Sequence, residues 1–68
     1  MDQPQRAVED YDEAIDLDPQ LALAYVNRAE VKTLLGRDTE AQQDVELAVG
    51  LGSDRSELEE RIEKLKAR

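Results

Sequence analysis

The chain of 68 residues contains no cysteine, no histidine, no phenylalanine and no tryptophan. Without cysteine it forms no disulfide, and without cysteine and histidine it lacks the ligands of the usual zinc sites and the commonest catalytic groups. The serines, Ser53 and Ser56, have no base beside them, and nothing in the sequence marks Lys32 as an activated amine. We therefore expect no enzymatic activity, no metal and no cofactor.

Basic residues are also scarce, because nine Lys and Arg stand against 17 Asp and Glu, which gives a net charge of −8. Nucleic acids and anionic membrane surfaces both require clustered Lys and Arg, so neither is expected as a partner. No apolar run approaches the ~20 residues of a membrane span, and no charged-then-apolar leader is present. The absence of cysteine is compatible with any compartment, and with neither leader nor span the expected location is the cytoplasm.

Only two prolines and three glycines interrupt the chain, and they divide it into helical segments. Pro19 disfavours helical geometry at Asp18, and Gly36 suits the left-handed position that ends a helix. Gly50 and Gly52 are expected to stop the third segment, whose N-cap is expected to be Asp38. These signals, with helix-period apolar spacing, predict an all-α fold with four helices at 4–17, 21–35, 38–49 and 54–67.

The chain also repeats itself at a fixed spacing. Asp10 returns 34 residues later as Asp44, and the series Ala7, Ala14, Ile15 and Leu17 returns as Ala41, Ala48, Val49 and Leu51. A fixed period of this length is typical of stacked helical repeats. In period and small-residue positions the chain resembles the tetratricopeptide repeat family, through YDEAIDLDP (11–19), AYVNRAEVKTLLG (24–36) and EAQQDVELA (40–48).

This resemblance implies a single domain, 1–68, built as a right-handed antiparallel helix-hairpin solenoid. Residues 4–17 would be the second helix of a truncated repeat, 21–51 a complete repeat, and 54–67 a polar capping helix of the kind that ends a solenoid. Two positions depart from the family pattern: Asp38 stands where an aromatic residue is common, and Ser53 replaces a proline.

Residues that stand at equal sequence distances before and after a turn should lie opposite each other on neighbouring helices, and we call this pairing reflection about the turn. Small residues should lie where the helices approach closely, and the reflections place Ala29 opposite Ala41 and Ala14 opposite Ala24. Reflection about Pro19 places Arg28 opposite Asp10, which predicts a salt bridge between them. Asp44, the repeat equivalent of Asp10, is expected near Ile62 and within reach of Arg61.

A second stripe of the helix at 21–35 is expected to face outward, and it contains Leu23, Val26, Asn27, Glu30, Thr33 and Leu34. The resemblance implies that this stripe lines a concave groove that binds an extended peptide. It also places Asn27 and Arg61 at positions that clamp a peptide carboxylate in a co-chaperone subgroup, but puts Glu57 where that subgroup has lysine. Asn27 could instead be a groove position left polar for water. Because Glu30, Glu57 and Glu60 lie on or beside the groove, a neutral or basic protein or peptide partner is expected.

An alternative from a different class is a structural unit that forms homo-oligomers through its N-terminal helix. The helix at 4–17 is expected to expose an apolar strip that includes Ala7, Tyr11 and Ala14. The acidic residues of the same region lack the spacing of a calcium loop, so a solvated acidic face is expected at Asp10, Asp12, Asp16 and Asp18. Groove binding and self-association are the two interpretations that the sequence leaves open.

Overall fold

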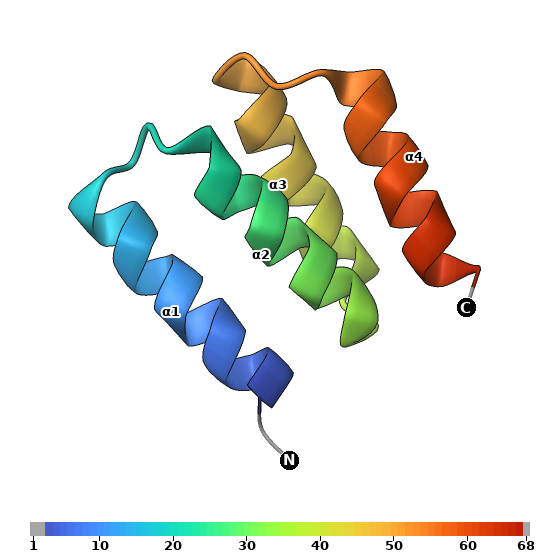
Figure 1. The fold of residues 1–68 in the computed structure, drawn as a ribbon, viewed down its shortest axis with the longest axis horizontal. Coiled ribbons are helices and arrows are strands. Elements are labelled where there is room, and N and C mark those ends of the chain that lie inside the picture. Colours follow the sequence, from blue (N-terminus) through green and yellow to red (C-terminus); the bar gives the residue numbers. More distant parts are fainter. Residues whose placement is uncertain (1–2, 68) are drawn as a thin grey trace.

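The structure, a computed structural model, describes residues 3–67 and contains four α-helices and no strand within that range. The helices are α1 (Gln3–Leu17), α2 (Ala22–Leu34), α3 (Asp38–Gly50) and α4 (Arg55–Lys66), and consecutive helices run antiparallel (Figure 1). The predicted all-α fold with four helices is confirmed, and each helix begins and ends within one residue of its predicted bounds. The molecule measures 32 × 31 × 15 Å along its principal axes, so it is thin and each helix leaves a wide outer face.

The ends of α2 and α3 are both formed by a glycine in the left-handed region, as the sequence predicts for Gly36. Gly36 has φ 77° and Gly52 has φ 111°. At each end the glycine N–H and the next N–H donate to the last turn of the helix, in the pattern of a Schellman motif: Gly36 to Thr33, Arg37 to Lys32, Gly52 to Val49 and Ser53 to Ala48. The prediction that Gly50 stops α3 is wrong, because Gly50 is its last helical residue and Gly52 supplies the left-handed turn.

The N-termini of α3 and α4 differ in how they are capped. The Asp54 side chain accepts a hydrogen bond from the Glu57 N–H at 3.1 Å and is the N-cap of α4. The predicted N-cap at Asp38 is wrong: Arg37 takes that position, and no side chain caps the helix there. The physical reason is the tightness of the turn, since Arg37 completes the Schellman motif of α2 and Asp38 is already helical.

The core lies between α2, α3 and α4, and α2 is its centre because it contacts each of the other three helices. Its buried residues are Tyr25, Val26, Ala29, Ala41, Val45, Ala48, Leu58 and Ile62. Ala29 and Ala41, which reflection places opposite each other, are 1% and 2% exposed. Ala24 is buried and Ala14 is half-buried, so the α1–α2 crossing is less enclosed than the α2–α3 crossing.

Arg28 joins three helices, but not through the predicted partner. Its Nε and Nη2 donate to the two oxygens of Asp44 at 2.9 and 2.6 Å, and its Nη1 donates to Asp12 at 2.6 Å. Lys32 Nζ lies 3.2 Å from Asp44, which is 1% exposed. The predicted pair with Asp10 is wrong, because Asp12 lies about 200° further round α1, on the side that faces α2, and is the α1 residue that pairs with Arg28. Hydrogen bonds from Arg28 to Asp44 and then to Asp12 raise the pKa of the guanidinium above its ordinary value.

An exposed ion pair between α3 and α4 gives a pH-dependent prediction. Arg55 donates to both oxygens of Glu46 at 2.6 and 2.7 Å, and Gln42 donates to one of them at 3.2 Å. The hydrogen bonds from Arg55, and to a lesser extent that from Gln42, lower the pKa of Glu46 from 4.5 to about 2. Because the folded-state pKa is depressed, the contribution of the pair to stability is complete above about pH 4.5 and is lost as the pH falls toward about 2.

We expect an NMR titration of the Glu46 carboxylate to give a midpoint near pH 2. Arg55→Gln should return the midpoint toward 4.5, and Gln42→Ala should raise it less, because Arg55 is the larger cause. Added salt should also raise it, since exposed pairs are screened. A midpoint that stays the same in Arg55→Gln would contradict the assignment.

Candidate functional site

The helix α4 lies on the opposite side of α2 from α1 (Figure 1), and two hollows lined by residues of α2 and α4 form a groove between these helices. At the end nearer the α3–α4 turn it contains a hollow of about 240 Å³, which we call the first hollow. Its residues come from both helices and the turn: Leu23, Val26, Ser53, Asp54, Glu57, Leu58 and Arg61. Val26 and Leu58 are each 6% exposed and form its floor, whereas Leu23 is 63% exposed and stands at its edge. The arrangement gives an apolar floor with a free leucine beside it.

A second hollow, of about 280 Å³, lies further along the same pair of helices and is lined by Glu30, Arg61, Lys64 and Leu65. Arg61 belongs to both hollows, and its Nε lies 2.9 Å from Oε2 of Glu30. This ion pair joins α4 to α2 across the groove. The predicted approach of Arg61 to Asp44 is therefore wrong, because Asp44 is enclosed with Arg28 and Lys32 on the far side of α2.

The structure brings only part of the predicted groove stripe together. Leu23 and Val26 line the first hollow, and Glu30 lines the second, each with Arg61. Asn27 is half-buried, and Leu34 is 58% exposed; neither lines the first or the second hollow. Within residues 3–67 the Asn27 side chain makes no hydrogen bond, so its amide is available to a ligand or to water.

Thr33 does not belong to the groove. It is 7% exposed, and its hydroxyl donates to the Ala29 carbonyl of the preceding turn at 2.9 Å. Ten residues separate Thr33 from Leu23, which places the two about 80° apart around the helix, and Thr33 lies on the Ala29 side. That side packs against α3, which is why the threonine is buried.

The charges along the groove are arranged in order. Asp54 and Glu57 line the first hollow. Glu30 and Arg61 form an ion pair further along the groove, and Lys64 lines the second hollow. Asp54 and Lys64 already have interactions within the chain, with the Glu57 N–H and with Glu60 at 3.3 Å. The groove therefore has an acidic end at the α3–α4 turn and a more basic end toward the C-terminus of α4.

Several lining residues were not predicted as site residues, namely Ser53, Asp54, Leu58, Lys64 and Leu65. Leu58 and Leu65 share one apolar stripe of α4 with Ile62, at the helical spacing 58, 62 and 65. Helical spacing alone does not show which residues of this stripe border the groove. Leu58 is buried while Leu65 is only half-buried, so one stripe contributes to both the core and the groove.

On α1 the predicted self-association strip is only partly open, since Ala7, Tyr11 and Ala14 are all half-buried. Val8, which the prediction did not include, is the buried residue of this helix. Asp10, Asp12, Asp16 and Asp18 are all exposed, as predicted, but they do not form one solvated face, because Asp12 faces α2 and pairs with Arg28 at 2.6 Å.

Within the described residues, 3–67, no helix is both long and apolar enough to cross a membrane. The same residues contain no group of three or more acidic side chains arranged to hold a metal ion. No protein-family model, curated protein or solved structure matches the chain.

Proposed function

We propose that this protein is a protein-interaction module that holds an extended segment of a partner protein in the groove between α2 and α4. The observation that carries the proposal is the pair of adjoining hollows, which share Arg61 and have the exposed Leu23 beside a floor of Val26 and Leu58. An exposed leucine beside a concave apolar floor is a usual element of a binding site. No enzymatic activity and no cofactor form part of the proposal.

The 34-residue period and the order of the helices also support this function, through the resemblance to tetratricopeptide repeats. On that interpretation α2 and α3 form one complete repeat, α1 is the second helix of a preceding repeat, and α4 is a polar cap. The four helices would then be a stretch of a right-handed helix-hairpin solenoid, with the groove on its concave side.

The size of the groove limits what it binds. The 12 residues of α4 make a helix about 18 Å long, which matches about five residues of extended chain at ~3.3 Å each. A segment of this length covers a small area, and interfaces below ~1,200 Å² are usually transient. Leu23 would supply the apolar contact, while Asn27, Glu30 and Arg61 would meet the polar groups of the partner's backbone.

Charge selects among partners. The net charge of −8 disfavours acidic segments, and Asp54 and Glu57 make the first hollow acidic. We therefore propose a neutral or basic segment whose cationic end lies at the α3–α4 turn. Added salt should slow its association, because rim charges act mainly on the rate of encounter.

The proposed groove is tested by replacing an exposed leucine beside it and comparing the loss of peptide affinity with that of a control leucine outside the groove. Leu23→Ser should weaken binding of a leucine-containing peptide with lysines at its amino end by about tenfold, since burying a leucine side chain stabilises by ~1.5–3 kcal/mol and Leu23 is already partly covered. Leu47→Ser removes a leucine that is 49% exposed on α3 and should leave the affinity unchanged. Amide-shift mapping on the whole chain measures both the affinity and the location of the site.

A second peptide, with aspartate and glutamate at its carboxyl end, separates this proposal from its alternatives. If the acid-tailed peptide binds more tightly and Asn27→Ala abolishes its binding, the groove is a partial carboxylate clamp and our assignment is wrong. The ion pair of Arg61 with Glu30 disfavours that outcome, because it offsets the charge that a carboxylate would need. If neither peptide shifts the amides of α2 and α4, the function is structural.

A further inference from the structure

At four positions where α3 packs against α2, α1 has the same residue 34 positions earlier at three and Tyr11 in place of Val45 at the fourth. The α3 residues are buried, with exposures of 2%, 1%, 1% and 0% for Ala41, Asp44, Val45 and Ala48. At 34 residues before each of them stand Ala7, Asp10, Tyr11 and Ala14, which we call the α1 face. The chain thus contains two similar helix-packing surfaces: that of α3 is covered by α2, and that of α1 is less covered.

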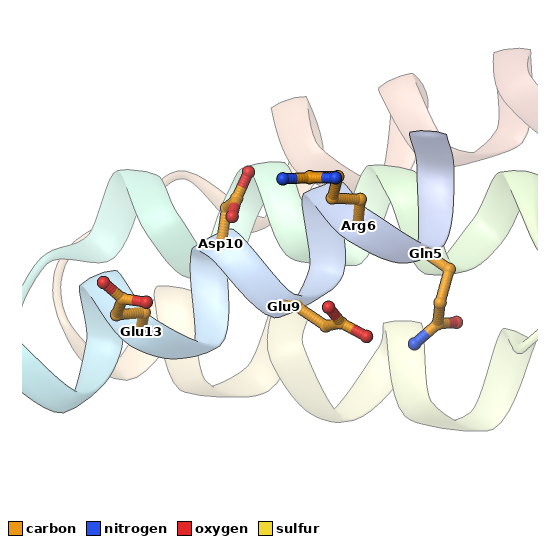
Figure 2. A pocket seen from close by; sticks show the side chains of 5 residues that line it. All are labelled: Gln5, Arg6, Glu9, Asp10 and Glu13. Atoms are coloured by element: carbon orange, nitrogen blue, oxygen red, sulfur yellow. The ribbon is translucent and has the colours of Figure 1, made fainter. Parts of the chain in front are cut away.

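The α1 face is partly open, with Ala7, Tyr11 and Ala14 half-buried, because among the described helices α1 contacts α2 alone. Asp10 is exposed, and within residues 3–67 it takes part in no ion pair, whereas Asp44 holds both Arg28 and Lys32. Beside it lies a hollow of about 430 Å³, lined by Gln5, Arg6, Glu9, Asp10 and Glu13 (Figure 2). Three carboxylates against one guanidinium make this region of the surface acidic.

We propose that the α1 face binds a basic amphipathic helix of a partner protein. The chemistry of the occupant follows from α2, which covers the equivalent face of α3 with Tyr25 and Ala29 and directs Arg28 to Asp44. The partner helix presents small apolar residues to Ala7, Tyr11 and Ala14, and an arginine on the same side pairs with Asp10. This surface lies on the opposite side of α2 from the groove and is a second binding site, independent of the proposed peptide function.

A second copy of the chain is a poorer occupant. The outer helix α4 has exposed Glu59 and Glu63 where α2, 34 residues earlier, has Tyr25 and Ala29. It therefore offers charge where the α1 face needs apolar contact. Two copies of α1 packed together would bring like-charged Asp10 side chains toward each other, in a chain whose net charge is −8. A basic partner helix has neither disadvantage.

The probe is a peptide with the sequence of residues 22–34 and blocked ends, added to the isotope-labelled whole chain. We expect amide shifts centred on residues 7–14 and weak affinity, because a helix of 13 residues pays an ordering cost when it binds. Replacing the peptide's arginine with glutamine, or Asp10→Asn in the chain, should each weaken binding at least about tenfold, since losing one partner of a covered charge pair removes the pairing energy.

Two more variants distinguish packing from charge. Ala14→Leu should abolish binding by blocking close approach of the helix, while Asp16→Asn, which removes an exposed carboxylate from the same helix, should leave it intact. Circular dichroism of each variant verifies that it is folded. Leu23→Ser, which tests the groove, should not affect this peptide, so the two proposals fail separately.

Three results would overturn the proposal. The first is the absence of shifts at millimolar peptide. The second is a set of shifts centred on the α2–α4 groove or on residues 41–48, where the peptide would be replacing α2. The third is sedimentation of the chain alone as a dimer that Ala14→Leu dissociates, which would make a second copy the natural occupant of the α1 face.

Discussion

Replacing Asp44 with alanine should lower the free energy of unfolding by about 3–5 kcal/mol, the typical cost of removing one member of a buried ion pair. The carboxylate is 1% exposed and accepts two hydrogen bonds from Arg28, with Lys32 at 3.2 Å. Its loss leaves two cations at 15% and 12% side-chain exposure without this counter-ion. A chain of 68 residues has roughly 3–10 kcal/mol of stability in total, so the variant should be largely unfolded or close to it.

Urea unfolding followed by circular dichroism measures this loss, and the repeat supplies its control. Asp10→Ala makes the same chemical change at the equivalent position of α1, where the side chain is exposed, and should change stability by no more than about 0.5 kcal/mol. Removing the cation that Asp44→Ala leaves unpaired should recover part of the lost stability. The double variant Asp44→Ala with Arg28→Met is therefore expected to lose less stability than the sum of the two single variants. A cost below 1 kcal/mol for Asp44→Ala alone would show that the cluster does not stabilise the fold.

The helices could be predicted from the sequence because their limits depend on local chemistry. A glycine that takes positive φ, a proline that restricts the residue before it and an aspartate that accepts a backbone N–H all act within a few residues. Gly36, Pro19 and Asp54 illustrate the three cases. The errors at Asp38 and Gly50 are also local, since in each turn two neighbouring residues could have filled the same position.

The partner of Arg28 could not be predicted in the same way. Reflection about a turn estimates which residues share a height along two helices, but not which way each side chain faces. Asp10 and Asp12 are at nearly equal heights and on different sides of α1. Moreover, α2 has neighbours on several sides, so Arg28 could reach α1 and α3, and it contacts both.

The groove was predicted in part for a related reason. Its centre follows from the stripe on α2, and Leu23 is as exposed as that stripe requires. Its opposite wall depends on where α4 packs, and nothing local to Leu58 or Lys64 specifies that position. Thr33 shows the limit of a helical stripe: it lies about 80° from Leu23 around α2, and there burial by a neighbouring helix decides whether a residue faces solvent.

Ala41→Leu is the second substitution with a large expected effect, and it tests the close crossing of α2 and α3. Ala41 and Ala29 are 2% and 1% exposed in one buried cluster, so a longer side chain at position 41 would be directed into buried neighbours and not into solvent. Forcing extra carbons into a packed core usually costs about 1–3 kcal/mol, through strained rotamers and displaced backbone. We expect a loss in that range, measured by urea unfolding.

The matched control is Gln43→Leu, which places the same side chain on the exposed face of the same helix. It should change stability by no more than about 0.5 kcal/mol, so the difference between the two variants isolates the crossing from any general effect of leucine on α3. Because α2 also forms one wall of the groove, separating α2 from α3 should disturb the groove as well. Ala41→Leu should then shift the amides of Leu23 and Arg61, which lie outside the crossing. Unchanged stability together with unchanged groove amides would mean that α2 and α3 are not closely packed at these alanines.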